Sequence, residues 1–151
     1  MNREYIRKAC KADVSRIAEI EIFNYRLYFY SIFQSDEFYF DELQVVPEAE
    51  ALAADENKLS RTYVYDDGAV KGFIRMNGDE VEKLFVEPVL HGQHIGEALL
   101  RYAMEELGAA WLWALEKNTG AIRFYERHGF HKTDIRKLEE DTTEYLVRME
   151  R

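Results

Sequence analysis

Hydrophobic side chains recur three and four positions apart over residues 14–29, which is the spacing of one face of an amphipathic helix. The residues on that face are Val14, Ile17, Ala18, Ile22, Tyr25 and Phe29. Asp13 stands directly before them and is expected to cap the helix. A short strand over residues 5–9 is predicted before this helix, and the Ala- and Glu-rich residues 48–59 predict a surface helix after it.

Residues 62–86 predict an antiparallel meander of three strands. The strands cover residues 62–65, 70–76 and 81–86, and turn signals rich in Asp, Asn and Gly separate them. Further along the chain, residues 110–115 are apolar without alternation, which is typical of a strand covered on both faces.

Two helices are predicted in the second half of the chain. Residues 92–107 place apolar side chains on one side of a helix. Asn118 or Thr119 is expected to cap a shorter helix that runs through His128. Gly129 stands where a left-handed residue closes such a helix.

The last two strands are predicted near Ile135 and over residues 143–149. The elements then follow the order β-α-α-β-β-β-α-β-α-β-β. This order predicts an α/β (α+β) fold, with a mixed, mostly antiparallel sheet of about six to seven strands flanked by helices.

Composition narrows the class of protein. With 151 residues, of which 47% are hydrophobic, the chain is expected to form a single domain over residues 1–151. Its 29 acidic and 20 basic residues give a formal charge of −9, which argues against nucleic acid as a partner. No apolar run is long enough to span a bilayer, so no membrane partner and a cytoplasmic location are expected. The single cysteine, Cys10, cannot form an internal disulfide.

Residues 84–100 run from a strand through a short glycine-containing loop into a helix, and this arrangement is typical of an anion site. Gly92 and Gly96 allow the backbone to approach a ligand closely. The unpaired N–H groups of the first helical turn can hold a diphosphate without a basic side chain.

Two motifs together resemble the GNAT superfamily of acyl-CoA-dependent N-acyltransferases. Residues 86–96 follow the pattern V-x-P-x-x-[Arg/Gln]-Gly-x-Gly-Ile-Gly, and residues 118–130 follow Asn-x-x-Ala-Ile-x-Phe-Tyr-x-x-x-Gly-Phe. The second match is complete. The first departs at His91, where the family has Arg or Gln, and at His94, where it has Gly.

The resemblance implies splayed central strands and acetyl-CoA as cosubstrate in the gap between the strand ending at Val86 and the strand ending at Leu115. The expected acetyl-CoA contacts are Leu84, Phe85, Val86, His91, Gly92, Gln93, His94, Ile95, Gly96, Asn118 and Tyr125. An N–H group at Phe85 or Val86 is expected to polarise the thioester carbonyl. Lys83, Lys117 and Arg123 are possible additional charges for CoA.

Transfer from a thioester to an amine requires two proton movements. By the resemblance, Tyr125 donates a proton to the leaving thiolate, with packing on its helix as the alternative. Glu82, and after it Glu80, are the candidate bases, since both are expected to alternate in register with Leu84 and Val86. Deprotonation through ordered water and an exposed structural acid are the alternatives. Helix capping is the competing role for Asn118.

Nine of the 21 aromatic residues lie between residues 22 and 40, flanked by acids, and form the expected wall of the acceptor site. Aromatic faces and carboxylates both favour a cation, which indicates a primary amine of a small molecule or of a protein. The His pairs at 91/94 and 128/131 raise the possibility of zinc, but no metal is expected because these pairs would have to converge.

The sequence therefore predicts an N-acetyltransferase that moves an acetyl group from acetyl-CoA to a primary amine in a ternary complex, as a monomer or homodimer. The alternative is a non-catalytic acyl-CoA-binding or regulatory module with the same fold.

Overall fold

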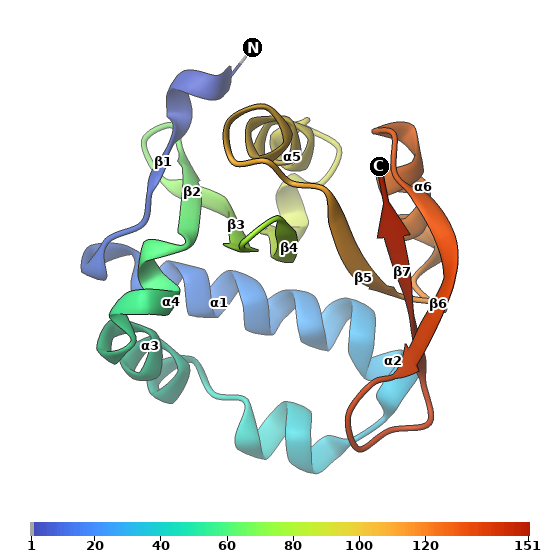
Figure 1. Cartoon of the computed structure of the whole chain (residues 1–151). Helices are drawn as coiled ribbons and strands as arrows, with labels where there is room; N and C mark the ends of the chain where they lie inside the picture. Colours follow the sequence, from blue (N-terminus) through green and yellow to red (C-terminus); the bar gives the residue numbers. More distant parts are fainter. Residues whose placement is uncertain (1) are drawn as a thin grey trace.

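The computed structural model describes residues 2–151, which form a seven-stranded sheet with helices on both faces (Figure 1). The strand order is β1-β2-β3-β4-β5-β7-β6. The strands are β1 Ile6–Lys8, β2 Thr62–Asp66, β3 Val70–Asn77, β4 Glu80–Val86, β5 Trp111–Leu115, β6 His131–Leu138 and β7 Tyr145–Glu150. All neighbours pair antiparallel except β4 and β5, which are parallel, so the predicted mixed and mostly antiparallel sheet is confirmed.

Six α-helices connect these strands within the described residues. They are α1 Val14–Asn24, α2 Tyr30–Phe33, α3 Val45–Ala54, α4 Glu56–Ser60, α5 Ile95–Glu106 and α6 Thr119–Arg127. Two π-helical segments, Tyr25–Phe29 and Glu37–Glu42, flank α2. Short 3-10 turns occur at Asn2–Tyr5, Lys11–Asp13 and Pro88–Leu90.

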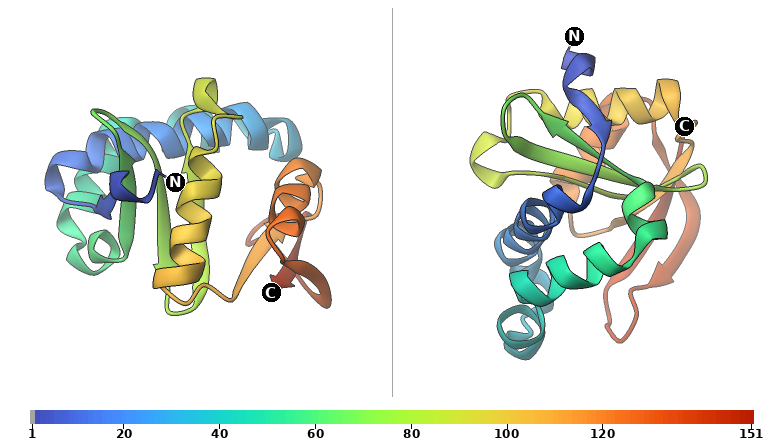
Figure 2. Two further views of the ribbon diagram at one scale, coloured as in Figure 1. Left: turned by 90° about the horizontal axis from the view of Figure 1, so that it is seen from above. Right: turned by 90° about the vertical axis from the view of Figure 1, so that its left-hand side faces the viewer.

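The helices form two layers, one on each face of the sheet, as the two views of Figure 2 show. Helix α1 packs on β3 and β4 from one side and carries α3 against it, while α5 packs on the same two strands from the other side. The core on the α5 side includes Ile74, Met76, Val81, Val86, Leu99 and Leu100. The core on the α1 side includes Ile17, Ile20, Leu52, Val64 and Phe73. Strands β3 and β4 are therefore fixed from both faces.

Strands β4 and β5 pair over two positions only, Glu80 with Trp111 and Val81 with Leu112. Beyond these positions β4 stays paired with β3, and β5 stays paired with β7. The two central strands therefore diverge toward their carboxyl ends, which confirms the predicted splay.

The predicted helix over residues 14–29 is helical but not uniform, because α1 gives way to a π-helical turn at Tyr25. Asp13 precedes α1 but makes no cap for it, which corrects the prediction. Its carboxylate accepts hydrogen bonds from the Cys10 N–H at 2.9 Å and from the Arg7 guanidinium at 2.8 and 2.9 Å. This guanidinium lowers the pKa of Asp13 below its usual range.

The predicted helix over residues 48–59 is divided at Asp55 into α3 and α4. The Asp55 side chain accepts a hydrogen bond from the Lys58 N–H at 3.0 Å, so this aspartate starts a new helix instead of continuing the first one.

Strand β5 is buried on one face only, whereas the prediction had it covered on both. Leu112 and Ala114 are buried, while Trp111 and Trp113 are half-buried. The guanidinium of Arg148 lies 4.0 Å from the Trp111 ring centroid, and Lys137 Nζ lies 4.4 Å from that of Trp113. Amphipathic basic side chains therefore cover this face in place of a further layer.

Candidate active site

The edge of β4 that faces the gap carries unpaired backbone groups. The Glu87 N–H donates to the Lys71 carbonyl at 2.9 Å, so the backbone of Glu87 is directed toward β3. Backbone directions alternate along a strand, so Phe85 also faces β3. Leu84 and Val86 face the gap, where β5 no longer pairs with β4. Of the three backbone positions predicted to contact CoA, Leu84 and Val86 are on the gap side.

Two side chains bind the carbonyl oxygen of Val86. Asn24 Nδ2 donates to it at 2.9 Å, and His91 Nε2 donates to it at 3.0 Å. Asn24 is buried in α1 and also donates to the Ile20 carbonyl at 2.8 Å. With its carbonyl held in this way, Val86 presents its N–H to the gap as the group left free for a ligand.

His91 joins the loop before α5 to the π-helical segment. Because a carbonyl only accepts, Nε2 carries the hydrogen toward Val86, and Nδ1 accepts from the Tyr28 hydroxyl at 3.0 Å. The His91 ring also stacks on Tyr28, with centroids 5.4 Å apart. Both ring nitrogens are thus used within the protein, so the role of His91 in the structure is to position the loop.

The loop over residues 91–94 is not helical, and α5 begins at Ile95 instead of the predicted Gly92. Gly92 adopts φ of +85°, where a residue with a side chain would be strained. His94 is left-handed at φ of +66°, although a helical backbone was predicted there. Its exposed ring lies 3.0 Å from Glu97 Oε2.

The first turn of α5 is open. The N–H groups of Ile95, Gly96 and Glu97 have no acceptor among the residues that the structure describes. A Cβ on Gly96 would lie 3.5 Å from Val86 Cγ2 and 3.6 Å from Phe124 Cζ, at ordinary contact distance, so Gly96 lies where α5 meets β4 and α6. Residues 91–94 before it are exposed, Gln93 included, so an anion can reach the turn.

Glu97 stands in this first turn and would repel an anion if it were not paired. His94 and Arg101 lie 3.0 and 3.1 Å from its two oxygens, and the His94 contact lowers the pKa of Glu97 most strongly. Arg123, which was predicted to supply a positive charge for CoA, is exposed on α6. Lys117, the second predicted helper, is paired with Glu144 at 2.7 Å.

Asn118 and Tyr125 both lie at α6, next to the carboxyl end of β5. Asn118 Oδ1 accepts from the Ala121 N–H at 3.2 Å, so the capping role is confirmed. Its Nδ2 makes no hydrogen bond within the described residues. The ring of Tyr125 packs edge-on against Phe124 and Phe130, with centroids 5.3 and 5.9 Å away.

The hydroxyl of Tyr125 has no hydrogen-bond partner within residues 2–151, yet it is not a buried unsatisfied atom. Its oxygen therefore keeps a small exposed surface although the ring is buried. Burial of the ring raises the pKa of Tyr125 above its ordinary value near ~10. The hydroxyl is protonated at neutral pH, as in an ordinary tyrosine, and the raised pKa keeps it protonated to higher pH.

The prediction that Glu80 and Glu82 share a face of β4 with Leu84 and Val86 is wrong. A β-bulge at Glu82 shifts the register between β3 and β4, and it turns both carboxylates to the α1 side of the sheet. Glu82 Oε1 lies 3.3 Å from Arg61 Nη1 and Oε2 lies 4.0 Å from Arg75. Burial raises the pKa of Glu80, and the neighbouring Glu82 raises it further.

A cavity of about 810 Å³ lies on the α1 side of the gap, and we call it the large cavity. It is bounded by the segment around α2 and by the β6–β7 loop, which lie next to each other in Figure 1. The lining residues are Tyr25, Phe29, Ile32, Phe33, Ser35, Phe38, Tyr39, Glu42, Lys83, Leu115, Glu139, Glu140, Asp141, Thr142, Thr143 and Glu144. Neither Glu80 nor Glu82 lines it.

Five of the nine aromatic residues of the predicted wall line the large cavity, and the acidic β6–β7 loop, which was not predicted as part of the site, lines it too. Tyr39 is buried here, and burial together with Glu139 raises its pKa to about 12. Lys83 from β4 contacts the Tyr25 hydroxyl, and Lys83 Nζ lies 5.0 Å from the Tyr25 ring centroid. Burial raises the pKa of Tyr25 well above its ordinary value.

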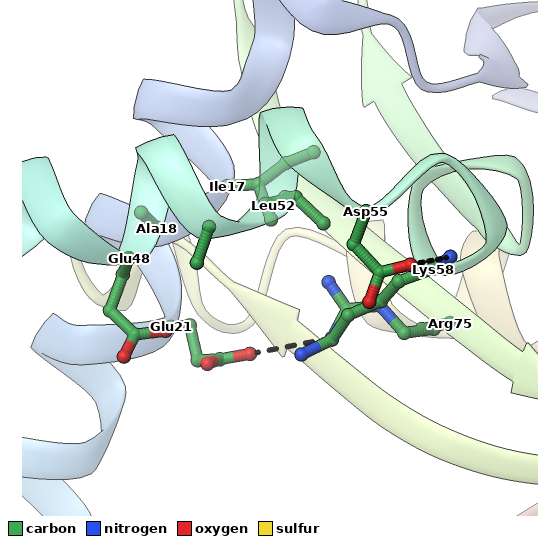
Figure 3. A pocket seen from close by; sticks show the side chains of 9 residues that line it. Ile17, Ala18, Glu21, Glu48, Leu52, Asp55, Lys58 and Arg75 are labelled. Carbon is green, nitrogen blue, oxygen red and sulfur yellow. Dashed lines mark hydrogen bonds and ion pairs between the residues drawn. The ribbon is translucent and has the colours of Figure 1, made fainter.

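A second cavity of about 90 Å³ lies between α1, α3 and β3 (Figure 3). The buried guanidinium of Arg75 points into it, with Nε donating to Thr62 Oγ1 at 2.9 Å and Nη1 3.7 Å from Glu21. This volume suits a few water molecules and is too small for CoA. Arg75 therefore ties α1 to the sheet behind the large cavity.

Within residues 2–151, no three His, Cys, Asp or Glu side chains gather in a way that could hold a metal ion. Among the helices of the described chain, none has the length and apolar character needed to cross a membrane.

The fold defines the class of protein first. The chain matches the PaiA N-acetyltransferase of Thermoplasma acidophilum, solved in complex with coenzyme A, over 97% of this chain and 98% of that one, with a TM-score of 0.73 and 21% sequence identity. It also matches the apo form of YjaB from Escherichia coli over 96% and 95% of the two chains, with a TM-score of 0.71 and 18% identity.

The sequence then identifies the family. Residues 58–132 match the acetyltransferase (GNAT) domain, so the chain belongs to the GNAT superfamily. The peptidyl-lysine N-acetyltransferase YjaB of Salmonella typhimurium is 33% identical over 46% of this chain and 48% of that protein. The peptidyl-lysine N-acetyltransferase YiaC of Escherichia coli is 36% identical over the same shares. The chain thus spans about half the length of the curated relatives it matches.

Proposed function

We propose that this chain is an N-acetyltransferase that transfers the acetyl group of acetyl-CoA directly to a primary amine. One observation carries the proposal: the unpaired edge of β4 at Leu84 and Val86 leads straight to the open first turn of α5. A ligand with an extended amide-containing arm and a diphosphate fits this arrangement, with the arm along the edge of β4 and the diphosphate at the first turn of α5. The matched GNAT domain and the CoA complex of the Thermoplasma relative support the same ligand.

Acetyl-CoA is proposed to bind with its pantetheine arm along Leu84 and Val86 and its diphosphate on the N–H groups of residues 92–96. Backbone groups and the helix dipole supply this binding, so an acidic protein can hold an anionic cosubstrate. Asn118 Nδ2 is available as a further donor or positioning contact. These elements are proposed to form a single acetyltransferase domain.

For the chemical step, the amine nitrogen attacks the thioester carbonyl carbon, and negative charge develops on the carbonyl oxygen. The Val86 N–H faces the gap and is the proposed donor to that oxygen. The C–S bond then breaks, and the Tyr125 hydroxyl donates its proton to the departing sulfur. This proton is present at neutral pH, as in an ordinary tyrosine, and the raised pKa of Tyr125 keeps it in place to higher pH.

The proton that the acceptor ammonium loses is proposed to leave through water. Glu82 is held by Arg61, and Glu80 stands at the closed end of the gap where β4 pairs with β5. Either carboxylate would have to act through intervening water, since neither lines the large cavity. We place the acceptor amine in that cavity, because its opening reaches Lys83 and Leu115 at the gap.

Thiol release from acetyl-CoA, measured with a panel of amines and lysine peptides beside calorimetric CoA binding, tests the function. The expected result is saturable binding together with amine-dependent thiol release. Binding without turnover on any amine contradicts the enzyme and supports the non-catalytic acyl-CoA-binding module. Absence of CoA binding contradicts both.

A further inference from the structure

We propose that the acceptor of this chain is a small aliphatic polyamine, which carries at least one positive charge besides the amine that is acetylated. This inference rests on the proposed acetyltransferase function and names the substrate class of the large cavity. The distribution of charge around that cavity carries it.

The acidic residues of the large cavity are largely without basic partners. The carboxylates that line it are Glu42, Glu139, Glu140, Asp141 and Glu144. Glu144 pairs with Lys117 at 2.7 Å. The other four form no ion pair with any residue that the structure describes. Some acids elsewhere on the surface do pair, as Glu116 does with Arg136 and Glu97 with Arg101, while others in the described chain, such as Glu50, do not. Several cationic groups of one ligand would compensate these four charges.

The walls between the charges are apolar. Tyr25, Phe29, Phe33, Phe38 and Tyr39 supply aromatic faces, which attract a cation within ~6 Å of the ring centroid and also pack against methylene groups. An occupant that alternates ammonium groups with short methylene chains matches such a lining. The volume of about 810 Å³ falls in the range of small-ligand sites.

Lys83 is the one basic side chain among the residues that line the large cavity. Its backbone precedes Leu84 in β4, and its ammonium contacts the Tyr25 hydroxyl in the large cavity. An ammonium beside this cation has a lowered pKa, because like charges disfavour the charged form. The reacting amine therefore becomes neutral more readily near Lys83, while the β6–β7 loop attracts charge toward the opposite wall.

Lys83 contacts the Tyr25 hydroxyl of the first π-helical segment. The other titratable groups around it in the large cavity are Tyr39 and Glu42 of the second π-helical segment and Glu139 and Glu144 of the β6–β7 loop. On the strands, Arg75 stands opposite Lys83 and lies 4.0 Å from Glu82. A monoamine is drawn to the acids and repelled from the gap. A polyamine can satisfy the acids with one charge and still present a second amine at Lys83. A single lysine side chain of a folded protein brings only one charge.

The test compares spermidine with nonylamine, a monoamine of the same chain length, by acetyl-CoA-dependent thiol release with the full chain. Spermidine is expected to have the higher kcat/KM. The variant E139Q/E140Q/D141N should lower that preference by about tenfold, because it removes partly exposed ion pairs. The matched control E4Q/E50Q/E56Q changes the net charge equally at exposed acids that form no ion pair and should leave the preference unchanged.

A second measurement addresses Lys83. Lys83→Gln should move the acidic limb of the spermidine kcat profile, which reports groups of the bound complex, to higher pH, whereas Lys8→Gln, an exposed lysine on β1, should not. An unmoved limb contradicts the role of Lys83.

Equal loss for both amines in the loop variant, or no loss for either, overturns the polyamine proposal. Turnover on lysine peptides with none on spermidine overturns it too, and in that case the acetyltransferase function survives. CoA binding without turnover on any acceptor is the distinct result that defeats the function itself.

Discussion

The residues proposed to hold acetyl-CoA and those proposed to hold the amine differ in the kind of group they contribute. The donor half, residues 84–96 and 118–130, offers mainly backbone N–H groups at a strand edge and a helix start. The acceptor wall, residues 25–42 and 139–144, offers aromatic rings and carboxylates. A site built from backbone groups needs glycines and helix caps at fixed spacing, so the donor half can be recognised in the sequence. Many different sets of side chains can line a cavity, so the acceptor wall has no comparable sequence pattern.

The local backbone of the two regions also differs. The acceptor wall contains two π-helical segments, a rare conformation that is frequent at functional sites. The donor half uses regular helices started by an open turn and by the Asn118 cap. His91 connects the two regions, since it bonds Val86 on one side and Tyr28 on the other. The donor half and the acceptor wall therefore differ in chemistry, but His91 connects them in the structure.

The largest expected effect falls on the chemical step. Tyr125→Phe removes the proposed acid and should lower kcat by about 100-fold, with the Kd of acetyl-CoA unchanged, because general acid catalysis contributes at least that much. Steady-state kinetics and calorimetry measure the two quantities. Tyr102→Phe on α5, a half-buried tyrosine beside Tyr63, is the matched control. Full turnover in the Tyr125 variant would leave that residue with a packing role alone.

The same tyrosine sets a pH expectation. Its pKa is raised by burial, so the protonated form that donates to sulfur persists above the usual tyrosine range. The unmodified chain should therefore show no alkaline fall in kcat from this group up to about pH 9.5, where an ordinary tyrosine begins to lose its proton. An alkaline limb that vanishes in Tyr125→Phe would contradict the raised pKa.

The next effect concerns the donor half alone. Gly92→Ala places a side chain at φ of +85° and should weaken acetyl-CoA binding by about tenfold, since such strain costs of order 1–2 kcal/mol. Gly78→Ala introduces a comparable strain at φ of +62° in the turn before β4, away from the gap. Calorimetry should show weakened binding in the first variant and none in the second. Equal weakening in both would attribute the effect to general destabilisation.

A smaller effect is expected from the acceptor wall. Phe38→Ala removes an exposed ring that lines the large cavity and should raise the amine KM about threefold without changing the Kd of acetyl-CoA. Phe40→Ala removes another exposed ring of the same π-helical segment, one that does not line the cavity. If both variants behave alike, the wall does not contact the amine.

Glu82→Gln should have the smallest effect. The carboxylate is paired with Arg61 outside the large cavity, so kcat is expected to stay within about twofold and the acidic limb of the pH–rate profile to stay in place. A fall in rate confined to low pH would indicate that Glu82 acts as the base. The reaction would then use a carboxylate that belongs to neither the donor half nor the acceptor wall.

Much of the fold follows from local signals in the sequence. Asn118 and Gly129 bound α6, and the glycine turns separate the meander strands, because caps and turns depend on a few neighbouring residues. The bulge at Glu82 was not predictable, since it arises from pairing with β3 and has no signature in its own strand. It reversed the expected direction of both candidate bases.

Within the site, the sequence indicated the gap, the open helix turn and Tyr125, but it missed the carboxylates of the β6–β7 loop. These residues are about a hundred positions from the aromatic segment, and only the sheet order brings the two together. His91 was similarly expected to contact a diphosphate, because its bond to Tyr28 spans 63 positions and leaves no local trace.

The pair of indoles on β5 has a practical consequence. Both tryptophans of the chain stand on this one strand, with ring centroids 6.1 Å apart and a basic side chain above each. The intrinsic emission of the protein therefore originates from a single strand on the rim of the gap. Occupancy of that rim becomes observable by fluorescence without any added label, and its response to salt reports how firmly Lys137 and Arg148 cover the rings.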